Sequence, residues 1–451
     1  MTQKAIGDFP PVSLSPVPQG RAWGMVAALF LIYVFAWLDR LTISMMVAPV
    51  KASLGLGDFQ MSLILGPSFA ISYAIFGIPL GWAADRYSRR LVIFFGVLIW
   101  ALATVACGFS TSFGTLMLCR IFVGIGEAAL LPASYALIAD AFSKDWVTMA
   151  TSVFQTAGKF GSAAAFGLGG MAIAFAKSLE GMNFPLHGPA SYWQIAFTLI
   201  GAPGLLLMFL VFTFPDPGRR SQSGTNRDAA APAFHELLVF IRLHGRLLSF
   251  MTVAFTALAI VGYSMTSWVP TFMERRFGWE PAQYGPALSL MNIFGAISLV
   301  ALGWAVDRLF SRGMRDAHLR FYSWTILALS PAILCAFFAT NPYIFLALYA
   351  LIQLITVPFI VYASAIIALL APSRLRGQLM GLFLFVFNIV GFGAGPAIVG
   401  ALTDFVFKDE RLIGWSLASV VIVGSAIAFL TMRLALGTLD RTVAAAQGDP
   451  A

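Results

Sequence analysis

The sequence predicts an all-α membrane protein with twelve transmembrane helices, arranged as two pseudo-symmetric six-helix bundles. Hydrophobic residues make up 59% of the 451 residues and charged residues only 11%, whereas soluble domains carry about 25% charged residues. Long apolar runs recur along the chain, and one loop motif occurs at corresponding places in the two halves. Twelve spans of ~20 residues use most of the length, so no large soluble domain fits.

Charge-free apolar runs mark the expected spans. The longest run, from Phe321 to Ser373, has no charged residue and would be about 80 Å long as a single helix. The sequence Thr340-Asn341-Pro342 is expected to divide it into two spans, because asparagine and proline are typical of turns. The twelve expected spans are 22–46, 60–84, 91–109, 113–139, 147–176, 192–214, 247–273, 283–306, 321–340, 343–371, 377–403 and 412–436.

One polar segment, rich in proline, glycine and serine at its start, separates the first six spans from the last six. Its end, from Phe234 to Arg246, has the composition of an amphipathic surface helix. The expected domains are an N-terminal tail (1–21), an N-terminal bundle (22–214), a linker (215–246), a C-terminal bundle (247–437) and a C-terminal tail (438–451).

The distribution of basic residues predicts the orientation in the membrane. With the N-terminus inside, the inward connections and tails carry 19 Lys and Arg residues, the outward connections carry 6, and 3 lie within spans. Because cytoplasmic loops are enriched in Lys and Arg, we expect both termini in the cytoplasm. We therefore expect a multi-pass protein of a bacterial-type inner (plasma) membrane.

Several classes of function are excluded by what the sequence lacks. The basic residues are not interleaved with aromatics as on a nucleic-acid surface, and no phosphate-binding Gly-x-x-x-x-Gly-Lys-Ser/Thr motif occurs. The cysteines lie within apolar runs and the histidines lack ligand spacing. We therefore expect no nucleic-acid partner, no metal, no cofactor and no enzymatic activity. The residues concerned are Cys107, Cys119, Cys335, His187, His235, His244 and His318.

One loop motif, Gly-Trp-Ala-x-Asp-Arg, follows the second span at residues 81–86 and the eighth span at residues 303–308. Five of the six positions are identical. Here the chain resembles the major facilitator superfamily, whose signature loop reads Gly-x-x-x-Asp-Arg/Lys-x-Gly-Arg-Arg/Lys. Ser88 stands in place of the second glycine of that signature. The resemblance implies a transporter of the major facilitator fold.

These two Asp-Arg loops (residues 81–90 and 303–312) are expected to act as gates. A carboxylate can face the positive N-terminus of a neighbouring helix, and the resemblance implies which helices these are. Asp85 would meet the start of span 11 near Ser373 to Gly377, and Asp307 the start of span 5 near Asp145 to Thr148. Such contacts would hold the cytoplasmic side closed. The expected gating residues are Gly81, Asp85, Arg86, Arg89, Arg90, Gly303, Asp307, Arg308 and Arg312.

Four charges lie within the first and fourth spans: Asp39, Arg40, Arg120 and Glu127. An ionisable group at mid-membrane costs at least ~2.5 kcal/mol, and counting from the span ends places all four near one depth. They form either a static ion network or a proton site. A carboxylate that changes partners between states changes its proton affinity, and arginine keeps its proton. Asp39 and Glu127 are therefore the expected proton-coupling groups, with the arginines as partners or as ligands of a substrate anion.

The residues around these charges narrow the resemblance. Residues 120–129, Pro132 with residues 138–140, and Leu38-Asp39-Arg40 are similar to the spinster branch of the superfamily. The resemblance implies a proton-linked carrier of lysophospholipids or sphingosine phosphate, with the acid after Gly126 and the Asp-Arg pair of span 1 as functional charges. The organic-anion symporters have a similar fourth span and remain the alternative.

Lys159 also lies near mid-depth, in span 5. It would bind an anionic headgroup, pair with Glu127, or extend along an apolar surface to water. The interiors of spans 7 to 12 carry no charge, and one charged half facing one apolar half suits a molecule with an ionic head and an acyl tail. The expected cavity-lining residues are Tyr33, Ser264, Thr266, Asn292, Gln353 and Asn388.

Together these features predict a monomeric, proton-coupled secondary active transporter of an amphipathic, lipid-like substrate that works by alternating access between the two halves. Its partners would be that substrate, protons and the membrane lipids, and its energy source the proton gradient. The alternative is a proton-coupled symporter of a small organic anion such as a sugar acid.

Overall fold

Twelve long apolar helices dominate the computed structural model, which describes residues 18–143, 146–181, 183–184, 188–217 and 234–447. Within these ranges, twelve helical segments are long and apolar enough to cross a membrane. They confirm the predicted fold class and the division of the run from Phe321 to Ser373 into two spans. The twelve segments are Gln19–Met45, Asp58–Arg86, Arg89–Cys107, Phe113–Ala141, Val147–Ser178, Tyr192–Phe212, Gly245–Phe277, Pro281–Ser311, Ala317–Ala336, Pro342–Leu370, Leu375–Phe407 and Glu410–Thr442.

The first half contains six of these spans, several of them built from two consecutive helical elements. Its helices are α1 (Gln19–Thr42), continued by the 3₁₀ turn η1 (Ile43–Met45), α2 (Val47–Leu54), α3 (Asp58–Leu65), α4 (Pro67–Arg86), α5 (Arg89–Cys107), α6 (Phe113–Glu127), α7 (Leu130–Ala141), α8 (Val147–Ser178), α9 (Tyr192–Leu207) and the 3₁₀ turn η2 (Met208–Phe212). The two-residue strands β1 (Asn183–Phe184) and β2 (Gly188–Pro189) form a small hairpin before α9.

The second half repeats this pattern. Its helices are α10 (Phe234–Leu243), α11 (Gly245–Phe277), α12 (Pro281–Ser311), α13 (Ala317–Ala336), α14 (Pro342–Thr356), α15 (Phe359–Leu370), α16 (Ser373–Val386), the π-helical turn η3 (Phe387–Ala394), α17 (Gly395–Ala401), the π-helical turn η4 (Leu402–Phe407), the 3₁₀ turn η5 (Glu410–Leu412) and α18 (Ile413–Gln447). Helix α10 is the surface helix predicted before span 7.

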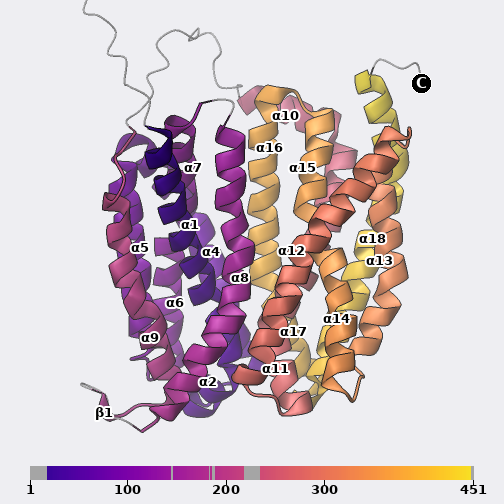
Figure 1. Ribbon diagram of the computed structural model, residues 1–451. Coiled ribbons are helices and arrows are strands. Elements are labelled where there is room, and N and C mark those ends of the chain that lie inside the picture. Colours follow the sequence, from indigo (N-terminus) through magenta and orange to yellow (C-terminus); the bar gives the residue numbers. More distant parts are fainter. Residues whose placement is uncertain (1–17, 144–145, 182, 185–187, 218–233, 448–451) are drawn as a thin grey trace, which may run out of the picture.

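The two halves stand side by side, and Figure 1 shows the first half in indigo to magenta and the second in orange to yellow. The start of α1, helix α10 and the end of α18 lie at one end of the bundle, the upper end in Figure 1. The connections 86–89 and 311–317 also lie there, so we call it the basic end. The connections 45–58, 277–281 and 407–410 lie at the opposite end.

Span 2 and span 11 are both interrupted where the halves touch, span 2 between α3 and α4 and span 11 at η3 before α17. Span 2 breaks between α3 and α4 at Gly66-Pro67, because proline has no N–H to continue the helical ladder. A Cβ on Gly66 would lie 3.0 Å from Pro396 Cγ and 3.2 Å from the Gly393 carbonyl oxygen. Only glycine therefore allows this approach, and the break brings α3 against α17 across the two halves.

The apolar core joins the halves unequally at the two ends. One buried cluster contains Met45, Val47 and Ile64 from the first half together with Met265 and Val269 from the second. A separate cluster fills the first half toward the basic end, and among the residues the structure describes it has one buried member from the second half, Phe392. The halves are thus packed together at the opposite end and far less so toward the basic end.

Candidate functional site

The centre of the first half holds an ion pair between α1 and α6. Arg40 donates from Nε to Glu127 Oε2 at 3.2 Å and from Nη2 to the same oxygen. The side chain of Glu127 is 1% exposed and that of Arg40 is 10% exposed. Glu127 is the last residue of α6, directly before the break that separates α6 from α7. Removing one partner of such a buried pair destabilises the protein by several kcal/mol, because the remaining charge is left in surroundings that solvate it poorly.

Aromatic rings surround the rest of the Arg40 guanidinium. Its carbon lies 4.3 Å from the ring centre of Phe69, 4.8 Å from Trp37 and 5.5 Å from Tyr73. The fourth ring, Phe392 at 5.9 Å, belongs to η3 of the second half. Ring faces attract cations, so Arg40 is held by one carboxylate and by rings from both halves.

Asp39 faces a different neighbour, although it is adjacent to Arg40 in the chain. Its Oδ2 accepts a hydrogen bond of 2.6 Å from the Thr104 hydroxyl on α5, and its Oδ1 is buried without a partner among the described residues. Successive helical residues point about 100° apart, so one residue of the Asp-Arg pair faces α5 while the other faces α6. Asp39 and Glu127 therefore do not share one arginine.

Arg120 is fully buried and has little to bond to. Its Nη2 donates a long hydrogen bond of 3.5 Å to the Arg40 carbonyl oxygen, while Nε and Nη1 have no partner in the described part of the chain. Its guanidinium lies 5.9 Å from the ring centre of Phe69, the same ring that lies 4.3 Å from the Arg40 guanidinium. The four charges predicted to meet at one depth are therefore one ion pair, Arg40 with Glu127, flanked by two less satisfied groups.

Lys159 lies on α8, is half buried, and makes no ion pair or hydrogen bond to the residues that the structure describes. Pairing with Glu127, one of the three expected roles, is absent in this conformation: Arg40 contacts Glu127 Oε2, and Oε1 is buried without a partner among the described residues. One turn before Lys159, Gln155 donates a hydrogen bond to the Tyr135 hydroxyl on α7. Residues four apart share a helix face, so Lys159 and Gln155 point the same way.

The predicted cavity-lining residues fall into two groups. Tyr33 stacks on Phe154, with 5.2 Å between ring centres, and Asn388 accepts a 3.1 Å hydrogen bond from the Tyr263 hydroxyl. Tyr263 lies edge-on to Phe392 at 5.0 Å, which links Asn388 through two rings to the Arg40 site.

The other four residues lie at contacts within or between helices of the second half. Ser264 is completely buried and bonds to the Gly395 carbonyl oxygen, and Gln353 is buried against Gly295. In this conformation both side chains lie at contacts between helices, and their cavity-lining role stays a prediction. Thr266 and Asn292 are half exposed and bond to carbonyl oxygens one turn earlier in their own helices.

The two Asp-Arg loops lie at the basic end without the contacts expected between helices. Asp85 and Asp307 are exposed, and neither forms an ion pair or hydrogen bond to a described residue. Arg86 and Arg308 lie over the rings of Trp82 and Trp304 in their own helices, at 4.6 and 5.4 Å.

The described residues of the helices expected to contact these loops are exposed as well. Thr148 and Gly377 are exposed, and a Cβ on Gly377 or on the loop residue Gly303 would meet no atom within 4 Å. The structure does not describe Asp145, nor the side chain of Ser373. Arg312 is exposed at the end of the second loop. Among the described residues, Asp85 and Asp307 of these loops make no ion pair or hydrogen bond that would close the basic end.

Two other loop residues have definite partners inside the first half. Arg89 pairs with Asp140 at the end of α7, and Arg90 donates from Nε to the Val211 carbonyl oxygen at 2.8 Å. Gly81 packs against Pro132, since a Cβ there would lie 3.8 Å from the proline Cβ. These contacts fix the first loop to its own bundle.

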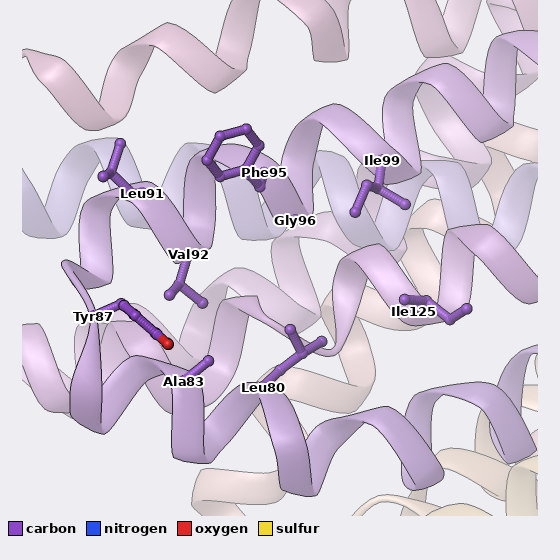
Figure 2. A pocket seen from close by; sticks show the side chains of 9 residues that line it. All are labelled: Leu80, Ala83, Tyr87, Leu91, Val92, Phe95, Gly96, Ile99 and Ile125. Atoms are coloured by element: carbon purple, nitrogen blue, oxygen red, sulfur yellow. The ribbon is translucent and has the colours of Figure 1, made fainter.

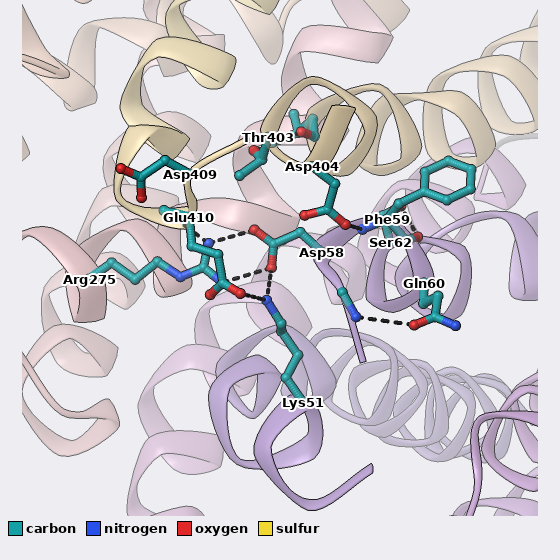
Figure 3. A network of polar contacts seen from close by, with 12 residues as sticks. Lys51, Asp58, Phe59, Gln60, Ser62, Arg275, Thr403, Asp404, Asp409 and Glu410 are labelled. Carbon is teal, nitrogen blue, oxygen red and sulfur yellow. Dashed lines mark hydrogen bonds and ion pairs between the residues drawn. The ribbon is translucent and has the colours of Figure 1, made fainter. Parts of the chain in front are cut away.

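The opposite end is closed by a network of four charges, two from each half, which we call the latch (Lys51, Asp58, Arg275, Glu410; Figure 3). Asp58 is fully buried and accepts from Arg275 Nη1 at 2.6 Å and Nη2 at 2.7 Å, and also from Lys51. Lys51 Nζ and Arg275 Nη2 each reach Glu410, at 2.7 and 2.9 Å. Both cations therefore bridge the two halves.

Backbone contacts extend the latch. The Phe59 N–H at the start of α3 donates to Asp404 Oδ2 on η4 at 2.8 Å, a cap that crosses from one half to the other. A second, exposed ion pair joins Lys177 to Glu280 at 2.8 Å, with the side chains 50% and 61% exposed.

Sequence reasoning missed the latch because its residues lie at span ends: Lys51 and Arg275 are two of the six basic residues counted in the outward connections. The available signal was Asp58 as the first residue of a span.

The arrangement has two consequences, one chemical and one mechanical. A buried carboxylate paired with a permanently charged arginine can exchange that arginine for a proton, since either one neutralises it. The latch and the open loops hold two bundles together at one end and leave them apart at the other.

Comparisons with known proteins agree with this architecture. Residues 29–317 match the Major Facilitator Superfamily. The chain is 29% identical to an MFS-type efflux pump of Mycolicibacterium smegmatis, covering 86% of each protein, and 24% identical to Protein spinster of Drosophila melanogaster, covering 95% of this chain and 70% of that protein. A crystal structure of a bacterial homologue of the human lysosomal transporter Spinster, inward-facing and unoccupied, superposes with a TM-score of 0.78 at 21% identity, covering 96% of this chain and 100% of that one.

We predict that Thr104→Val destabilises the fold. The substitution keeps the shape of the side chain but removes the one hydrogen bond to buried Asp39, at a cost of about 1–3 kcal/mol. The check is thermal unfolding of the purified protein in detergent. Thr252→Val is the matched control, because the Thr252 hydroxyl bonds to the Leu248 carbonyl oxygen of its own helix. Equal melting temperatures for the two variants would contradict the assignment.

We predict that Asp58→Asn opens the latch, because it leaves Lys51 and Arg275 without their shared buried carboxylate, a loss of about 3–5 kcal/mol. Hydrogen exchange measured by mass spectrometry should rise in α3 and η4. Lys177→Gln is the control: it breaks the exposed ion pair between the halves, which contributes about 0–1 kcal/mol, and should leave exchange unchanged. Similar exchange in both variants would show that the latch does not hold the halves together.

Proposed function

The chain belongs to the Major Facilitator Superfamily and resembles its spinster branch, and we propose that it is a proton-coupled secondary active transporter of an amphipathic, lipid-like anion. The observation that carries the proposal is the buried Arg40–Glu127 pair of the first half, which lies beside Phe392 of the second half in a fold whose bundles are packed together mainly at one end. A transporter that works by alternating access needs both features, a site between the halves and a closure that can change ends.

The orientation follows from charge. The basic end carries most of the Lys and Arg residues of the connections, and cytoplasmic loops are enriched in these residues. The basic end is then cytoplasmic, and the latch closes the outer side of an inner membrane. The exposed Asp85 and Asp307 belong to an inward-open state. The fold likeness to an inward-facing structure supports this reading.

Proton coupling would come from competition for Arg40. When Glu127 is ionised, it holds the guanidinium; an incoming anion that takes over Arg40 would leave a buried carboxylate without a partner. Such a carboxylate is unstable in a low-dielectric site and takes a proton instead. Binding of the anion and protonation of Glu127 therefore favour each other. Arginine keeps its charge throughout.

Asp39 is the second titratable group of the site. Its Oδ1 is buried without a partner among the described residues, and Thr104 supplies its single hydrogen bond. Protonation would remove the buried charge of Asp39 when the access of water to the site changes between the two states. Asp39 would thus follow the conformational change, while Glu127 responds to the substrate.

The proposed substrate matches the unequal chemistry of the halves. Arg40 and half-buried Lys159 supply positive charge from the first half, whereas Phe392 and Tyr263 present aromatic surface from the second. A phosphate headgroup near the cations and an acyl chain along the rings would satisfy both, as in a lysophospholipid or a sphingoid phosphate. A sugar acid would need more hydrogen-bonding groups from the second half than Tyr263 and Asn388 provide.

We predict that Glu127→Gln abolishes proton-coupled transport, because glutamine can neither bind nor release a proton. In liposomes under an imposed pH gradient, substrate-dependent proton flux should fall to the level of empty liposomes, and Asp39→Asn should also lower it. The control is Glu180→Gln, which changes an exposed acid outside the site. Wild-type coupling in both site variants would overturn the proposed proton site.

We predict that lysophospholipids raise the melting temperature of the protein and that sugar acids do not. A ligand at a hundred times its dissociation constant adds about 2.7 kcal/mol to stability. Lys159→Gln should weaken the shift, whereas Lys177→Gln, which removes a lysine far from the headgroup site, should not. Stabilisation by sugar acids alone would favour the organic-anion alternative.

A further inference from the structure

Two of the three cysteines of the chain lie on neighbouring helices of the first half. Cys107 is the last residue of α5 and is fully buried, whereas Cys119 lies on α6 and is half buried. The third, Cys335, is exposed on α13 of the second half. All three are free thiols, and neither the Arg40 site nor the latch uses them.

Helices α5 and α6 pack closely, and their contacts define how they are aligned. A Cβ on Gly126 of α6 would lie 2.6 Å from the backbone nitrogen of Trp100 on α5, so the two backbones nearly touch there. Figure 2 shows the same region from the side, where Ile99 of α5 and Ile125 of α6 line one apolar pocket. Trp100 and Gly126 therefore lie at the same level of the two helices.

This alignment places the cysteines opposite each other. Consecutive spans run in opposite directions, and Cys107 lies seven residues after Trp100, while Cys119 lies seven residues before Gly126. Seven residues make about two helical turns. Each cysteine is therefore displaced by the same length along its helix, and it lies on the helix face that makes the close contact.

The side chains agree with this alignment. The Cys107 thiol donates a hydrogen bond to Cys119 Sγ. The Ser110 hydroxyl donates to the same sulfur at 4.0 Å, and the Ser110 N–H donates to the Cys107 carbonyl oxygen at 3.1 Å. The turn that follows α5 therefore holds the Cys119 sulfur beside the end of that helix.

Cys119 is the better placed nucleophile of the two. It is half exposed, whereas Cys107 is sealed from water. Its sulfur accepts from two donors, and the positive charge of Arg120, the next residue in the chain, acts on it as well. The thiolate is the attacking form of cysteine, and nearby cations and donors support its charge. A reactive cysteine beside a second one is the arrangement of redox-sensing thiols.

We propose that Cys107 and Cys119 form a redox pair that hydrogen peroxide converts into a disulfide. The Cys119 sulfur attacks one peroxide oxygen and the O–O bond breaks, which gives a sulfenic acid and one water molecule. The Cys107 sulfur then attacks the sulfenic sulfur, the S–O bond breaks, and the oxygen leaves as a second water molecule with the thiol proton. Two thiols are thus oxidised to one disulfide, and the peroxide is reduced to water.

The disulfide would join the two helices that carry the less satisfied charges and their neighbours. Thr104, which bonds to Asp39, lies three residues before Cys107 on α5, and Arg120 directly follows Cys119 on α6. Because α5 and α6 belong to the same half, the bond would stiffen that half and leave the two halves free to move. Its formation needs neither transport nor a substrate, so it can be tested apart from the proposed function.

The test locates the free thiols of the full-length wild-type protein. Reduced, purified protein would be treated with hydrogen peroxide and then unfolded in N-ethylmaleimide, and the alkylated cysteines would be identified by peptide mass spectrometry. Cys107 and Cys119 should escape alkylation, appear in one disulfide-linked pair of peptides, and become alkylated again after reduction with dithiothreitol. Cys335 should form no disulfide within the chain.

Serine variants assign the two roles. In Cys107→Ser, oxidation of Cys119 should stop at the sulfenic acid, which dimedone traps. In Cys119→Ser, the buried Cys107 should keep its thiol. Cys335→Ser is the matched control and should form the disulfide like the wild type. The wild-type measurement needs no substitution, so misfolding of a variant would leave its result valid.

Alkylation of both Cys107 and Cys119 in peroxide-treated wild type would overturn the proposal, as would a disulfide that joins either of them to Cys335. Equal dimedone labelling of Cys107 in Cys119→Ser and of Cys119 in Cys107→Ser would overturn the assignment of Cys119 as the attacking thiol.

Discussion

The ion pair between Arg40 and Glu127 is the interaction on which the rest of the structure depends. It joins α1 to α6 in the middle of the membrane, where a charge without a partner costs several kcal/mol. Since Arg40 cannot lose its charge, every state of the protein has to supply it with an anion or with access to water. One of the surrounding rings, Phe392, belongs to the second half. The access of anions and water to Arg40 therefore depends on how the two halves lie against each other.

The two ends of the bundle differ in how far their carboxylates are buried and paired. At the opposite end, Asp58 is sealed from water and neutralised by cations that also reach the second half, so the halves cannot part there without exposing it. At the basic end, Asp85 and Asp307 are exposed and no such constraint acts in the described residues. A protein built this way can change from one closed end to the other by exchanging partners for carboxylates, with little change inside each bundle.

Much of this could be predicted from the sequence because it depends on composition and period. Apolar runs gave the twelve spans, and charges inside those runs pointed to Asp39, Arg40, Arg120 and Glu127. Partner choice could not be predicted, since the one-residue offset between Asp39 and Arg40 sends them to different helices. The latch was missed because Asp58 and Arg275 lie at span ends, where charges are common. The role of Ser264 could not be read from its residue type, because a polar side chain that bonds to a neighbouring helix looks, in sequence, like one that lines a cavity.

The most direct measurement of the central claim is proton uptake on binding, in weakly buffered detergent solution with a pH indicator and no membrane gradient. If an anionic substrate displaces Glu127 from Arg40, adding a lysophospholipid to the wild-type protein should draw protons from solution, in proportion to the lipid bound. Binding without any proton uptake would contradict the account, because it would mean that Glu127 keeps both its charge and its arginine when the site is filled.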